Sequence, residues 1–159
     1  MTPFLQNIDH INIVVKDLET VKAFFVSLGF EVKDRSRLSG EWISKIVDLK
    51  DVDAEYVRLT LPGDSISIEL IRFVHPPLNE VSNSEKANTQ GIRHLAFRVR
   101  DIEKTVAFLK QKGIAPLSAV QEYAKLHKKL VYFHGPEGIL LELAQYAEDG
   151  IDQFSPPDC

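Results

Sequence analysis

Residues 8–19 read IDHINIVVKDLE, and residues 92–103 read IRHLAFRVRDIE. The two stretches share a histidine, a mostly apolar run after it and an aspartate before a helix-like segment, at an offset of 94 − 10 = 84 residues. The offset holds without a gap through three further matched pairs, Ala23/Ala107, Phe24/Phe108 and Gly29/Gly113. The chain therefore contains two copies of one module.

Each copy begins with apolar and β-branched residues, which favours a strand over 8–15 and over 92–99. The aspartate that follows is a typical helix N-cap, and a glycine ends each helical stretch. A short extra helix is expected at 41–49 in the first copy. The other expected strands are 30–37, 53–61 and 65–73 in the first copy and 115–121, 129–134 and 139–144 in the second. The pattern predicts an α+β fold built from two tandem β-α-β-β-β modules.

The chain has 159 residues, of which 44% are hydrophobic, enough for a single domain with a real core. Within that domain we expect module one at about 7–73, a polar linker at 74–90 and module two at about 91–145. An acidic, proline-containing tail is expected at 146–159.

The overall charge and composition exclude several classes of function. The net charge is −4, the pI is about 5.7, and Lys and Arg are dispersed, so nucleic-acid binding has no electrostatic support. No apolar run approaches membrane-spanning length. The one cysteine, Cys159, cannot form an intrachain disulfide. We therefore expect a cytoplasmic protein whose partner is a small molecule.

Each module supplies one histidine and one glutamate for a possible site. Because strand side chains alternate between two faces, His10 and Glu69 should lie on the face opposite the helices of module one, and His94 and Glu142 on that of module two. Such groups would be costly to leave unpaired in a partly dry cavity, and a divalent metal is the simplest compensation. The alternative is that they are ordinary hydrogen-bonded or solvated residues.

The motifs at 8–11 (IDHI), 67–70 (SIEL), 91–97 (GIRHLAF) and 136–143 (PEGILLEL) carry a family resemblance. Together they resemble the vicinal-oxygen-chelate superfamily, which includes glyoxalase I, methylmalonyl-CoA epimerase, extradiol dioxygenases, fosfomycin-resistance enzymes and bleomycin-binding proteins. The resemblance implies that the two modules form a curled, partly open mixed sheet around a metal site.

The order His10, Glu69, His94, Glu142 is similar to the ligand order of glyoxalase I, and nearly that of the epimerases, which often have Gln where Glu69 stands. The resemblance implies one divalent metal per site (Ni, Co, Mn, Fe or Zn) and a lyase or isomerase that acts through an enediolate. It also implies that Glu142 or Glu69 carries the proton. A methylmalonyl-CoA epimerase-like isomerase and a non-catalytic ligand-binding protein of the bleomycin-resistance type stay open as alternatives.

Three further residues are weaker substrate-binding candidates. Arg98 shares the face of His94 and could meet an anionic group or reach solvent. Trp42 could wall the pocket or belong to the core. Glu41 could be a second proton carrier in an epimerase or a surface residue at a helix start.

The lysines at 125, 128 and 129 form a basic stretch that could attract a phosphate or carboxylate, although a solvated turn is the simpler interpretation. Exposed strand edges also predict a homodimer, whose sites lie within one chain or are shared between chains.

Overall fold

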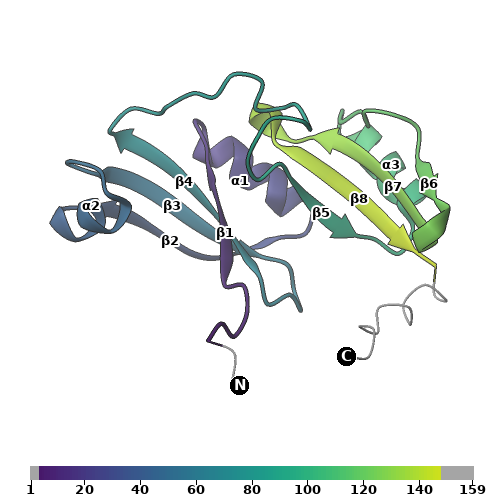
Figure 1. Cartoon of the computed structure of the whole chain (residues 1–159), viewed down its shortest axis with the longest axis horizontal. Helices are drawn as coiled ribbons and strands as arrows, with labels where there is room; N and C mark the ends of the chain where they lie inside the picture. Colours follow the sequence, from purple (N-terminus) through teal and green to yellow (C-terminus); the bar gives the residue numbers. More distant parts are fainter. Residues whose placement is uncertain (1–3, 148–159) are drawn as a thin grey trace. The chain divides into compact units, whose positions relative to one another are not determined.

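The computed structural model describes residues 4–147 and divides into two compact units, Met1–Glu80 and Val81–Cys159. Each unit holds one copy of the repeated module as a four-stranded mixed sheet with a helix after its first strand. Figure 1 shows the elements of both units. The α+β class and the repeated β-α-β-β-β order are confirmed.

The first unit has the sheet order β1-β4-β3-β2. Strand β1 runs parallel to β4, and the other pairs are antiparallel, as a β-α-β start followed by a meander requires. The elements are β1 (His10–Val14), α1 (Leu18–Ser27), β2 (Glu31–Ser39), α2 (Glu41–Val47), β3 (Asp53–Thr60) and β4 (Ser67–His75).

The second unit repeats this topology with the order β5-β8-β7-β6. A single turn of 3₁₀ helix, η1 (Ala124–Leu126), stands where the first unit has helix α2, and a second one, η2 (Pro136–Gly138), precedes the last strand. The other elements are β5 (His94–Arg98), α3 (Ile102–Gln111), β6 (Gln121–Tyr123), β7 (Lys128–His134) and β8 (Leu140–Tyr146).

The two repeated aspartates cap their helices as predicted. The carboxylate of Asp17 accepts a hydrogen bond from the backbone N–H of Thr20 at 3.0 Å, and that of Asp101 accepts one from Lys104 at 3.0 Å. These bonds satisfy donors that have no partner inside the helix. They also lower the pKa of both aspartates, because they favour the charged form.

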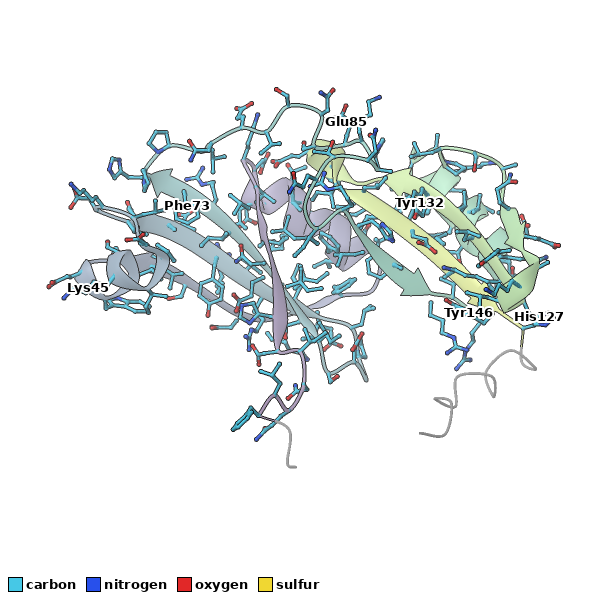
Figure 2. All side chains as sticks on the ribbon, viewed as in Figure 1. Lys45, Phe73, Glu85, His127, Tyr132 and Tyr146 are labelled. Carbon is cyan, nitrogen blue, oxygen red and sulfur yellow. The ribbon has the colours of Figure 1, made fainter. Side chains whose placement is uncertain are left out.

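The sheet of the first unit carries a helix on each face. Helix α1 packs against β3 and β4, where Val57, Leu59 and Leu70 are fully buried. On the opposite face, Ile43 of α2 packs on a cluster completed by Val52, Ala54 and Ile71, with Leu38, Tyr56 and Phe73 at its margin. Figure 2 labels Phe73 on β4 and Lys45 on α2. Helix α2 therefore covers one end of the face that also carries Glu69.

Two expectations about local structure are wrong. Trp42 is 56% exposed and does not belong to the core, because the neighbouring Ile43 faces the sheet instead. The strand expected at 115–121 is shorter and lies later in the chain, since β6 covers only Gln121–Tyr123. Before it, Pro116 forms an isolated β-bridge with Phe133. Proline lacks the N–H that a continuous ladder would need.

The remaining boundaries agree with the sequence to within a few residues. Strand β8 extends through Tyr146, so the first residue of the expected tail belongs to the sheet. Residues 148–159 of that tail lie outside the described residues. Within residues 4–147, no helix is both long and apolar enough to cross a membrane.

Candidate functional site

Strand register brings a histidine beside a glutamate in each unit. In the parallel pair β1–β4, Asn12 lies opposite Glu69, and His10 lies two residues earlier on the same face. In β5–β8, Ala96 lies opposite Glu142, and His94 occupies the position equivalent to His10. The two His–Glu pairs are therefore produced by the same register in two copies of one fold.

In the first unit, Nε2 of His10 lies 3.3 Å from Oε2 of Glu69. The other ring nitrogen, Nδ1, lies 2.7 Å from Oδ2 of Asp9. A carboxylate on one ring nitrogen fixes the tautomer and the ring orientation of a metal-binding histidine. The pKa of Asp9 is lowered, first by this hydrogen bond with His10 and then by the positive charge of Arg58.

In the second unit, Nε2 of His94 lies 3.1 Å from Oε2 of Glu142, whose side chain is only 4% exposed. The ring of Tyr132 lies with its centroid 5.0 Å from that of His94. Tyr132 is the cross-strand partner of Glu142, and Figure 2 labels it on β7. Burial, followed by the negative charge of Glu142, raises the pKa of Tyr132.

Each glutamate also contacts a cation that the sequence reasoning did not place at the site. Arg58 lies opposite Glu69 in β3, and its Nε donates to Oε1 at 3.1 Å. Lys128 of β7 places Nζ 2.6 Å from Oε1 of Glu142. The expectation that Lys128 belongs to a solvated turn is wrong, because its side chain is 15% exposed and paired.

The surroundings of both cations reinforce these pairs. The pKa of Lys128 is raised overall. Burial is the largest single effect and lowers this pKa, but the contact with the Glu142 carboxylate and, to a smaller extent, Tyr146 raise it by more. Arg58 also donates from a second nitrogen to Asp9 at 2.8 Å. In the first unit, Arg58 thus links the carboxylates on the two sides of His10.

The weaker substrate candidates are not part of these pairs. Arg98 lies with its guanidinium carbon 5.2 Å from the ring centroid of Tyr146. Glu41 is exposed and pairs with Lys45 at 2.7 Å, as a surface residue at a helix start would. Trp42 is exposed on α2, the helix that packs on the Glu69 face of its sheet.

The donor atoms of the two pairs fit a divalent metal. Neutral imidazole nitrogen and carboxylate oxygen are the ligands that Zn, Fe, Co, Ni and Mn commonly take in proteins. Each unit supplies one nitrogen and one oxygen, which is half of a ligand set. Within residues 4–147, no three or more His, Cys, Asp or Glu side chains are gathered in an arrangement that could hold an ion.

Comparison with known proteins agrees with the fold. Residues 9–133 match the model of the Glyoxalase/Bleomycin resistance protein/Dioxygenase superfamily. The chain is 31% identical over 140 residues to the uncharacterized protein YwkD of Bacillus subtilis, covering 87% of this chain and 96% of that one. It is 30% identical over 141 residues to the uncharacterized protein YaeR of Escherichia coli, covering 87% and 95%.

Among solved structures, a glyoxalase family protein from Bacillus cereus is similar at a TM-score of 0.82 and 30% identity, covering 91% of this chain and 96% of that one. The chain therefore belongs to the glyoxalase/bleomycin resistance protein/dioxygenase superfamily, as its motifs indicate.

Proposed function

We propose that the protein binds one divalent metal through His10, Glu69, His94 and Glu142 and acts as a lyase or isomerase of the glyoxalase I type. The observation that carries this proposal is the repeated pair: in each module, Nε2 of a histidine faces Oε2 of a glutamate across parallel strands. Members of the superfamily commonly use a divalent metal, which supports the same conclusion. The substrate is a small molecule with two adjacent oxygens.

When bound, the metal supplies a Lewis acid that stabilises negative charge on substrate oxygens. The chain itself must move a proton beside a carbonyl, and Glu142 is the better proton carrier of the two glutamates. Its side chain is only 4% exposed, so burial keeps competing water away from the carboxylate. Glu69 is held more rigidly, because the planar guanidinium of Arg58 is itself anchored by Asp9. Glu69 therefore acts chiefly as a ligand.

Metal analysis tests the ligand set directly. Wild-type protein should bind one equivalent of Ni²⁺, Co²⁺, Mn²⁺, Fe²⁺ or Zn²⁺ per chain, and His10→Ala and Glu142→Ala should each lose most of it. His127→Asn is the matched control, since His127 lies in the turn between η1 and β7, outside the two His–Glu pairs, and has a left-handed φ of +46° that Asn tolerates. Equal metal content in all four proteins would refute the ligand assignment.

Turnover distinguishes the candidate activities. Metal-loaded protein should act on the hemithioacetal of methylglyoxal if the glyoxalase assignment is right, and on methylmalonyl-CoA if the epimerase alternative is right. Glu142→Gln should abolish turnover more completely than it weakens metal binding. A protein that binds a ligand equally well with and without metal, and turns over neither substrate, would be a binding module instead.

We also propose that the chain forms a homodimer. Within the described residues, apolar side chains such as Val14, Val32 and Ile92 are exposed on or beside strands. Mixing His10→Ala with Glu142→Ala chains would regenerate one intact site per mixed dimer if each site is shared between chains, and none if each lies within one chain. Sedimentation as a monomer at micromolar concentration would rule out the dimer.

A further inference from the structure

The two oxygens of each glutamate have different partners, and the division is the same in both units. Oε2 faces the histidine, at 3.3 Å for Glu69 and 3.1 Å for Glu142. Oε1 faces a cation, at 3.1 Å from Nε of Arg58 and 2.6 Å from Nζ of Lys128. The cations come from different register positions, because Arg58 lies directly opposite its glutamate whereas Lys128 lies opposite Tyr146. In each unit, a different kind of basic side chain contacts the glutamate oxygen that does not face the histidine.

Both cations are held in place by groups other than the glutamate. Arg58 donates to Asp9 at 2.8 Å from its terminal nitrogen. Lys128 lies with Nζ 5.6 Å from the ring centroid of Tyr146. Each cation thus has a second contact besides Oε1 of its glutamate.

A carboxylate can bind a metal through one oxygen or through both. An ion of octahedral preference has about six positions. Two histidines and two glutamates that each use one oxygen would fill four of those positions and leave about two for adjacent substrate oxygens. If both glutamates used both oxygens, the protein would fill about six positions and leave no place for a chelating substrate.

We propose that Arg58 and Lys128 are positioning residues that occupy Oε1 of Glu69 and Glu142, so that each glutamate offers a single oxygen to the metal. This inference rests on the proposed metal-binding function and concerns the number of coordination positions left open. It assigns a purpose to two basic residues that stand beside ligands of a cation, where positive charge would otherwise only weaken metal binding.

The test counts the exchangeable water molecules on Mn²⁺ bound to the purified protein, by water-proton relaxation. Lys128→Met and Arg58→Met each free one Oε1, so each variant should lose about one water relative to wild type as its glutamate takes a second position. Lys128→Arg and Arg58→Lys should restore the wild-type number. Lys129→Met is the matched control, since Lys129 points to Glu122 at 4.0 Å and not to Glu142.

An unchanged water number in both methionine variants would overturn the inference while leaving the metal site intact. If wild-type protein binds no Mn²⁺, the proposed function fails and this inference falls with it. If Lys128→Met does not fold, Arg58→Met decides the question, because its glutamate is 19% exposed and tolerates the loss of a partner better than Glu142.

Discussion

Replacing Lys128 by methionine in the metal-free protein should destabilise the second unit strongly. Methionine keeps most of the side-chain volume but removes the charge that lies 2.6 Å from Oε1 of Glu142. The side chains are 15% and 4% exposed, so the carboxylate would stay buried with no cation beside it. Breaking a buried pair in this way costs about 3–5 kcal/mol.

The corresponding change in the first unit should cost much less. Arg58 and Glu69 are 32% and 19% exposed, so water can solvate the carboxylate that Arg58→Met leaves behind. We expect a loss of about 1 kcal/mol, as for partly exposed ion pairs. Both variants remove a cation from Oε1 of a glutamate, and Arg58→Met also removes the contact of Arg58 with Asp9.

Urea unfolding in the presence of EDTA measures both effects. The single tryptophan, Trp42, reports on the first unit, and far-UV circular dichroism reports on both. With a denaturant slope of about 1–2 kcal/mol per molar, Lys128→Met should lower the midpoint of the second unit by about 1.5 M or more. Adding Glu142→Gln to Lys128→Met should recover most of the loss, because it removes the unpaired charge. Equal losses in the two units, or no recovery in the double variant, would refute the reasoning.

Three further outcomes are expected. Phe133→Ala, at a fully buried core position, should cost about 3–5 kcal/mol in urea unfolding, whereas the exposed Trp42→Ala should stay within about 0.5 kcal/mol. The cap hydrogen bonds lower the pKa of Asp101 in the folded protein below 3.8. Wild type should therefore be more stable than Asp101→Ala above pH 3.8, and this difference should vanish as the pH falls through the pKa of the folded state. A difference that persists in acid would contradict this. Chelating the metal should lower the melting temperature of wild type and leave that of His94→Ala unchanged.

Much of this fold follows from periodicity and repetition. The matched segments at 8–19 and 92–103 predicted the two strand–helix starts, and their aspartates predicted the caps. Alternation along the strands was enough to put the His and the Glu of each module on the same face, and the parallel pairing seen in the structure makes them neighbours.

The same reasoning could not predict which basic residues contact the two glutamates. Arg58 became visible only once the β3–β4 register was known, since a cross-strand neighbour has no fixed spacing in sequence. Pairing β3 with β4 as a hairpin around the 62–64 turn could have suggested that Arg58 lies beside Glu69. Lys128 lies four residues along β7 from Tyr132, the direct partner of Glu142, so only side-chain length brings it to Oε1. Neither the alternation of side chains along a strand nor the preference of residues for strands predicts such a contact.

Helix α2 interrupts the symmetry of the repeat, since the second unit has only the 3₁₀ turn η1 in its place. The helix is fastened to the sheet through Ile43, on the same face as Glu69, and it begins and ends at Gly40 and Asp48, both with positive φ. Its removal or exchange would leave β2 and β3 joined across a short gap. Residues 40–48 are therefore a natural segment to exchange, because the cover over one end of the Glu69 face can be rebuilt without changing the strands that carry His10 and Glu69.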